Sequence, residues 1–152
     1  MRVTLPSRDR LLEACTGSTP ITHPVLRAAR DLAHLHRQRR EATTEIHEID
    51  CARADLIHTI DCWVAANMPQ PFGAAYMNSE SVGMIIDRIA QYCIEAHTTL
   101  TESTTEPDRH FLWQRLAELT LAYTDLAIEL TAGLRKLPSC TYRHPTTSGR
   151  AP

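Results

Sequence analysis

The chain has 152 residues, a length typical of one domain, and its 16 basic and 18 acidic residues give a formal net charge of −2. This balance excludes recognition of nucleic acid or of an acidic membrane surface through net charge alone. Eighteen Ala and sixteen Leu outnumber four Val, and only five Gly are present. The composition therefore favours helices over strands and over glycine-loop nucleotide folds.

Residues 1–23 are predicted to form a flexible peripheral arm with one short helix from Arg8 to Cys15, which Ser7 caps. The arm lacks the continuous apolar run of a secretory signal, and no segment approaches the ~20 apolar residues of a membrane span. We therefore expect a cytoplasmic protein without a membrane partner. In that compartment the five cysteines are expected to be reduced thiols.

Two apolar stripes with helical spacing come next. The first follows Pro24, a residue suited to the first position of a helix, and consists of Val25, Leu26, Ala29, Leu32 and Ala33. The second consists of Ile46, Ile49, Leu56, Ile57, Ile60, Trp63 and Val64. At 100° per residue the second stripe is rotated by about 130° from the continuation of the first, more than a coiled coil tolerates. The chain is therefore predicted to kink or break near residues 39–44.

Residues 67–78 hold two prolines and a glycine, so the second helix must end before them. This loop is unusually apolar, which favours packing over the end of a bundle and leaves a lid over a binding site as the alternative. Its length leaves the connectivity of the bundle open. A third helix follows, with Ser79 as its predicted cap and a stripe of Val82, Ile85, Ile86, Ile89, Tyr92, Cys93, Ala96 and Leu100.

The fourth helix is predicted to begin at Pro107 and to end near Gly133 and Pro138. Its core-facing residues are Leu112, Leu116, Leu119, Tyr123, Leu126, Leu130 and Leu134. Residues 137–152 are polar without periodicity and are expected to form a flexible tail. The sequence thus predicts an all-α fold in which residues 24–136 form one bundle of four main helices.

Four of the five cysteines have a histidine four residues away, a spacing that places both side chains on one helix face. The pairs are His47–Cys51, His58–Cys62, Cys93–His97 and Cys140–His144. Zinc usually takes four N or S ligands, and each pair supplies two. The two pairs of the second helix lie about 16 Å apart along its axis, so a zinc site would need a second helix or subunit. We therefore expect that the protein binds no metal and no cofactor. The His and Cys residues of the second helix are expected to form a stripe that faces solvent or a partner.

Two patterns leave an enzyme open as the alternative. Arg53 and His58 have the Arg-x4-His spacing of the HEPN ribonucleases, which are also all-helical, and the Cys/His pairs are compatible with a metal-dependent helical-bundle hydrolase. Asp31 with His34, and Asp55 with His58, loosely resemble the Glu-x-x-His spacing of carboxylate-bridged bundles. Common hydrolase and nucleotide motifs are absent from the sequence.

Arg53 falls inside the apolar arc of the second helix, where a guanidinium needs acceptors. The candidate polar cluster consists of Asp50, Arg53, Asp61, Asp87 and Arg88. We interpret this cluster as an interhelical ion pair that sets the register of the second and third helices. The functional alternative is a polar pocket in which Arg53 or Arg88 receives an anionic ligand.

Two stretches, residues 45–64 and 78–97, carry a family resemblance. The matching residues are Ile49, Arg53, Asp55, Ile60 and Asp61 in the first stretch and Glu80, Gly83, Ile86, Asp87 and Arg88 in the second. On these residues the chain resembles a bacterial family, domain of unknown function 4254. Cys51, His58 and Cys62 depart from the usual residues of that family.

The resemblance covers residues 24–100 and extends to about 136. It implies an all-helical fold and supplies no catalytic residue. The resemblance does not specify a function. The shifted stripe leaves one helix face for a partner, so we expect a binding or assembly module that is a homodimer rather than an enzyme. The expected partners are a second copy of the chain or another protein, and nucleic acid is disfavoured.

Overall fold

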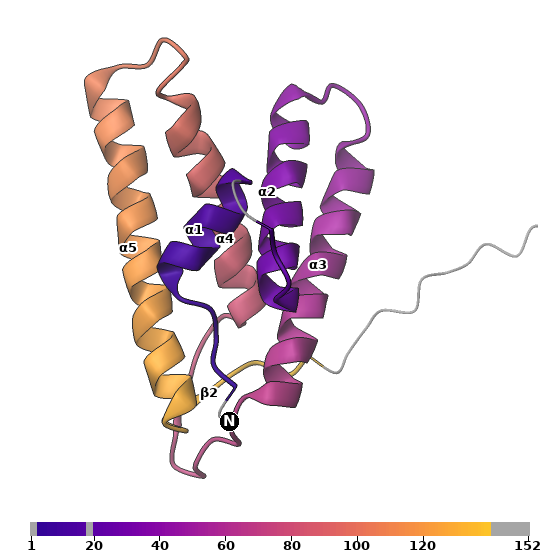
Figure 1. Ribbon diagram of the computed structural model, residues 1–152, viewed down its shortest axis with the longest axis vertical. Helices are drawn as coiled ribbons and strands as arrows, with labels where there is room; N and C mark the ends of the chain where they lie inside the picture. Colours follow the sequence, from indigo (N-terminus) through magenta and orange to yellow (C-terminus); the bar gives the residue numbers. More distant parts are fainter. Residues whose placement is uncertain (1–2, 18–19, 141–152) are drawn as a thin grey trace, which may run out of the picture.

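The computed structural model describes residues 3–17 and 20–140, and this part of the chain forms five helices and two short strands. In chain order they are α1 (Arg8–Thr16), α2 (Pro24–Glu41), α3 (Ile46–Asn67), β1 (Tyr76–Met77), α4 (Val82–Thr98), α5 (Glu106–Thr131) and β2 (Arg135–Lys136). Two helical hairpins, α2–α3 and α4–α5, stand side by side, and α1 crosses in front of them (Figure 1). The predicted all-α fold is confirmed.

The break between the first two predicted helices is also confirmed. The α2 helix ends at Glu41 and α3 begins at Ile46, so the chain reverses over 42–45. Glu45, which directly precedes α3, has a φ of 63°, a left-handed conformation that a continuous helix does not contain. The two stripes of different orientation therefore belong to two antiparallel helices that pack against each other.

Side-chain caps explain where four helices begin. Each cap accepts a hydrogen bond from a backbone N–H of the first turn, which otherwise lacks a partner. The caps are Ser7 for α1, His23 for α2, Ser81 for α4 and Thr105 for α5. The prediction of Ser79 as the cap of α4 was wrong by two residues, because it is the Ser81 hydroxyl that accepts from the Met84 N–H at 3.2 Å.

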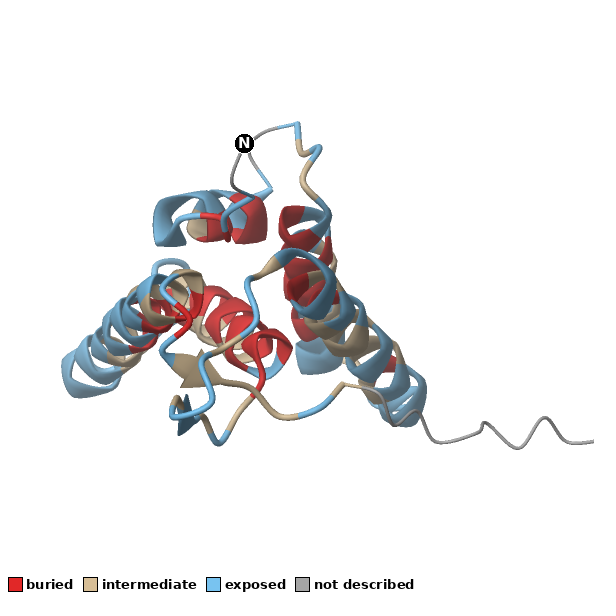
Figure 2. Ribbon diagram, turned by 90° about the horizontal axis from the view of Figure 1, so that it is seen from below, coloured by how far each residue is buried: buried red, intermediate tan, exposed pale blue. Residues whose placement is uncertain are grey.

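The hydrophobic core centres on α4, which packs against α1, α2, α3 and α5. Figure 2 shows buried residues gathered on the faces of these helices that meet at the centre. All five predicted core residues of α2 are buried, as are Ile49, Ile60 and Val64 of α3. The stripe of α4 is buried from Val82 to Ala96 except for the half-buried Tyr92.

Three predicted core residues lie at the surface. Leu100 and Leu134 are 64% and 53% exposed because they lie two and three residues beyond the ends of α4 and α5, where the helical spacing no longer applies. Ile46 is the first residue of α3 and is also exposed. Apolar periodicity therefore predicted the faces of the helices correctly but overran their ends.

The prediction of a flexible peripheral arm was wrong for α1. Leu11, Ala14 and Cys15 lie on one face of this helix, and none is more than 1% exposed. The Tyr123 hydroxyl of α5 donates to the Pro6 carbonyl at 2.7 Å and holds the preceding segment in place. Spacings of three and four residues bury one side of even this short helix, so α1 completes the core.

The loop between α3 and α4 contributes a strand that the sequence did not predict. Tyr76 and Met77 of β1 pair in parallel with Arg135 and Lys136 of β2. Gly133, with a φ of 73°, turns the chain after α5 and brings it to the loop. The loop therefore joins the C-terminal segment at one end of the bundle. Most of the predicted tail, 141–152, lies outside the described residues.

No helix in the described part of the chain is both long enough and apolar enough to cross a membrane.

Candidate functional site

A polar network joins α2, α3 and α4; it consists of His36, Arg39, Asp50, Arg53 and Asp87 and is buried at His36 and Asp87 but open to solvent at Arg39 and Asp50. The Asp87 carboxylate accepts from His36 Nε2 at 2.8 Å and from Arg53 Nη2 at 2.6 Å. The Arg53 guanidinium also donates to Asp50 at 2.9 Å, and Asp50 in turn accepts from Arg39 at 2.9 Å. This interhelical polar network ties three helices together through one carboxylate of α4.

The network keeps its carboxylates ionised. Burial by itself raises the pKa of Asp87, but the hydrogen bonds from His36 and Arg53 outweigh burial and hold that pKa below its usual value. The hydrogen bond from Arg39 lowers the pKa of Asp50, with a further contribution from Arg53. The interpretation of Arg53 as one partner of an interhelical ion pair therefore matches the geometry. The guanidinium is already engaged by two carboxylates.

The other two predicted cluster residues lie elsewhere. Asp61 accepts a hydrogen bond from the Gly83 N–H at 2.7 Å at the start of α4, and burial raises the pKa of this carboxyl. Arg88 forms an ion pair with Glu80. The structure therefore brings only three of the five predicted cluster residues together, namely Asp50, Arg53 and Asp87. Asp61 and Arg88 each have separate partners.

Sequence reasoning missed His36 and Arg39. A signal for His36 was present, because it continues the stripe of α2 by one helical turn beyond Leu32 and is only 6% exposed. Arg39 carried no comparable signal, since it lies near the exposed end of α2 and its contact with Asp50 depends on how the chain reverses.

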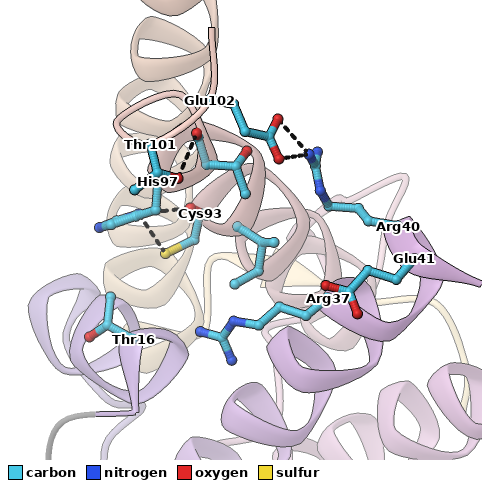
Figure 3. A pocket seen from close by; sticks show the side chains of 10 residues that line it. Thr16, Arg37, Arg40, Glu41, Cys93, His97, Thr101 and Glu102 are labelled. Atoms are coloured by element: carbon cyan, nitrogen blue, oxygen red, sulfur yellow. Dashed lines mark hydrogen bonds and ion pairs between the residues drawn. The ribbon is translucent and has the colours of Figure 1, made fainter.

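A second feature is a pocket of about 420 Å³ between α1, α2 and α4, which we call the Cys93 pocket. Its lining residues are Thr16, Arg37, Arg40, Glu41, Cys93, Ile94, His97, Thr98, Thr101 and Glu102. Figure 3 shows Cys93 and His97 of α4 on one side of the pocket and Arg37 of α2 opposite them. The pocket thus combines a thiol, an imidazole, two guanidinium groups and several hydroxyls within a volume suited to a small molecule.

The thiol of Cys93 is unusually acidic. Its hydrogen bond with Cys15 is the main cause, and the nearby His97 and Arg37 add to it, so the pKa of Cys93 falls to about 7 although burial opposes the change. The pKa of Cys15 moves the other way, because this thiol donates to Cys93 and is buried. Cys93 is therefore the more acidic thiol of the two.

His97 and Arg37 offer donors to the pocket. His97 Nδ1 lies 2.7 Å from the Cys93 carbonyl oxygen, which requires a proton on Nδ1 and leaves Nε2 as the second ring nitrogen. Arg37 uses Nη2 to donate to the Cys15 carbonyl at 2.9 Å. A guanidinium has five N–H donors, so the others are available to a ligand. Arg40, by contrast, is paired with Glu102 at 3.1 Å.

The structure does not bring together the residues on which the two enzyme hypotheses depend. Arg53 points to Asp50 and Asp87, whereas His58 lies 3.3 Å from Cys62 on another side of α3. Within 3–17 and 20–140, no three His, Cys, Asp or Glu side chains converge as metal ligands would. The partner of Cys140, His144, lies outside the described residues.

Comparison with known proteins identifies one family. The family model described as protein of unknown function (DUF4254) matches residues 22–139, which confirms the resemblance carried by the two stretches in α3 and α4. No curated protein and no solved structure matches the chain.

Proposed function

The chain belongs to the DUF4254 family, and from its geometry we propose that it is a helical binding module whose Cys93 pocket receives a small anion. The observation that carries this proposal is the partly engaged guanidinium of Arg37, which faces an acidic thiol and a histidine across the pocket. A carboxylate or phosphate group is the chemistry that such a guanidinium recognises best.

The charges of the pocket favour a ligand with one anionic group. Arg37 and His97 lie near enough to the thiol to lower its pKa, while Arg40 is neutralised by Glu102. Glu41 adds a carboxylate to the lining and disfavours a strongly charged polyanion. The negative charge of an anion bound beside Cys93 disfavours the thiolate, so ligand binding raises the pKa of Cys93.

The experiment titrates acetate and inorganic phosphate into the protein at pH 7 and follows the thiolate absorbance of Cys93, measured against Cys93→Ser, together with the heat of binding. Binding lowers the thiolate absorbance, and Arg37→Gln weakens binding by about ten- to a hundred-fold, the effect of losing one charged hydrogen bond. Arg30→Gln is the matched control, because Arg30 lies on α2 and pairs with its neighbour Asp31. Equal responses of both variants, or no response of the wild type, overturn the proposal.

The proposal includes a cytoplasmic homodimer that is not an enzyme. A reducing compartment keeps Cys15 and Cys93 as the thiols that the pocket uses. The α3 helix supports a dimer, because it packs against α2 and α4 on one side and carries exposed residues along the other. Native mass spectrometry of untagged protein tests this part of the proposal, since a monomeric mass at micromolar concentration overturns it and leaves the pocket unaffected.

A further inference from the structure

The outer face of α3, which is the side turned away from α2 and α4, carries two histidine–cysteine pairs. His47 Nε2 lies 3.6 Å from Cys51 Sγ, and His58 Nε2 lies 3.3 Å from Cys62 Sγ. Both cysteines are exposed, and α3 stands at the edge of the bundle in Figure 1. Each pair is therefore assembled within one helix and is accessible to a second molecule.

The geometry of each pair fits two ligands of one zinc ion. Zinc binds imidazole nitrogen at about 2.0 to 2.1 Å and thiolate sulfur at about 2.3 Å, so a tetrahedral angle places the two ligands roughly 3.5 Å apart. The two N···S distances of 3.6 and 3.3 Å bracket this value. A tetrahedral ion needs two more ligands, and in the described part of the chain no third His, Cys, Asp or Glu joins either pair.

The spacing of the pairs is symmetric. Positions 47 and 62, like positions 51 and 58, lie at equal distances from the midpoint between Ala54 and Asp55. A two-fold axis through this midpoint places α3 of a second copy antiparallel to the first. His47 and Cys51 of each copy then face His58 and Cys62 of the other. All four residues lie within about 60° of the helix surface, so both pairs face the same partner helix.

We propose that two copies of this chain bind two zinc ions between their α3 helices, each ion held by His47 and Cys51 of one copy and His58 and Cys62 of the other. The inference rests on the homodimer of the proposed function and identifies its interface. Each ion displaces the protons of two thiols, so Zn²⁺ and two thiolates form a site without net charge, and two protons are released. The two ions lie about 16 Å apart along the helices.

The rest of the face accommodates a second helix. At the midpoint, small Ala54 lies opposite Asp55 of the second copy, which allows close approach. The only Arg or Lys of α3 is Arg53, and its guanidinium is directed to Asp87 and Asp50 on another side of the helix. No cation of α3 itself therefore opposes zinc on the outer face.

The test uses the full chain, freed of metal with a chelator and titrated with Zn²⁺, and measures mass by light scattering and metal content by native mass spectrometry. The expected product is a dimer with two zinc ions. Two double variants, His47→Ala/Cys51→Ser and His58→Ala/Cys62→Ser, each lose half of every site and remain monomers without tightly bound zinc. Cys140→Ser, which alters a cysteine outside α3, is the matched control and behaves as wild type.

Mixing the two double variants gives the sharpest outcome. In the antiparallel pairing a mixed dimer has one intact site and one site without ligands, so the mixture regains a dimer that holds one zinc ion. A single double variant that still binds one ion per dimer overturns the pairing, because like pairs would then face each other. A dimer indifferent to zinc overturns the zinc site and leaves the homodimer standing. A monomer that binds no zinc overturns both.

Discussion

Replacement of Asp87 by Asn tests whether the interhelical polar network stabilises the fold. The carboxylate of Asp87 is the only group of α4 in the network as described, and it accepts from both His36 and Arg53. Asn has nearly the same shape as Asp but no charge. Its NH₂ group is a hydrogen-bond donor and would face the donor group of His36 or Arg53. The variant therefore removes the charge with little change of volume.

The expected loss follows from the burial of the partners. Breaking a buried ion pair by removing one partner costs roughly 3 to 5 kcal/mol, because the other charge stays buried without compensation. The side chain of Arg53 is 21% exposed and keeps Asp50, so the expected loss falls to or just below the lower limit of this range, at about 2 to 3 kcal/mol. Asp125→Asn, at an exposed carboxylate of α5, is expected to change stability by less than about 0.5 kcal/mol.

The pH dependence supplies an independent check. The pKa of Asp87 is lower in the folded than in the unfolded chain, so its charge stabilises the fold above the unfolded value of about 4. This contribution disappears as the pH falls through the folded pKa. Urea unfolding of wild type and Asp87→Asn at pH 7, and at decreasing pH below 4, measures the difference. A variant as stable as wild type at pH 7, or a difference that persists unchanged in acid, refutes the reasoning.

Three further predictions concern α1 and α4. Gly83→Ala destabilises by roughly 1 to 3 kcal/mol in urea unfolding, because the new Cβ would lie 2.4 Å from the Ile57 carbonyl oxygen, whereas Gly73→Ala meets no atom within 4 Å and is the control. Leu11→Ala costs about 2 to 5 kcal/mol in the same assay, and a loss below 1 kcal/mol contradicts a packed α1. The thiolate absorbance of Cys93, measured against Cys93→Ser, increases with pH and reaches half its maximum near pH 7; a midpoint above pH 8 contradicts the acidic thiol.

The sequence predicted the helices better than the contacts between them. Apolar spacing identified the buried faces of α2 and α4 because helical periodicity is a local property. It did not show that α1 packs on the bundle, since a nine-residue helix flanked by turn residues is also typical of a surface arm. The strand pair β1–β2 was beyond reach, because two-residue strands carry no periodicity and join segments far apart in the chain.

The candidate site was likewise predictable where it depends on local sequence and unpredictable where it depends on tertiary contacts. The position of Arg53 among apolar residues predicted a buried charge that needs acceptors, and Asp50 and Asp87 were correctly among its candidates. The Cys93–His97 spacing was visible in the sequence as one pair among four. What made it distinctive is the approach of Cys15 from α1 and Arg37 from α2, which changes the acidity of Cys93 and depends entirely on tertiary packing.

The residues that carry the family resemblance explain packing rather than ligand recognition. Arg53 and Asp87 join α3 to α4, and Gly83 lets the two helices approach so closely that Asp61 bonds its N–H. A sequence pattern built on these residues therefore specifies how two helices meet. The Cys93 pocket lies on the α1 and α2 side of α4, and the histidine–cysteine pairs lie on the outer face of α3, so both proposed sites use surfaces that this packing leaves open.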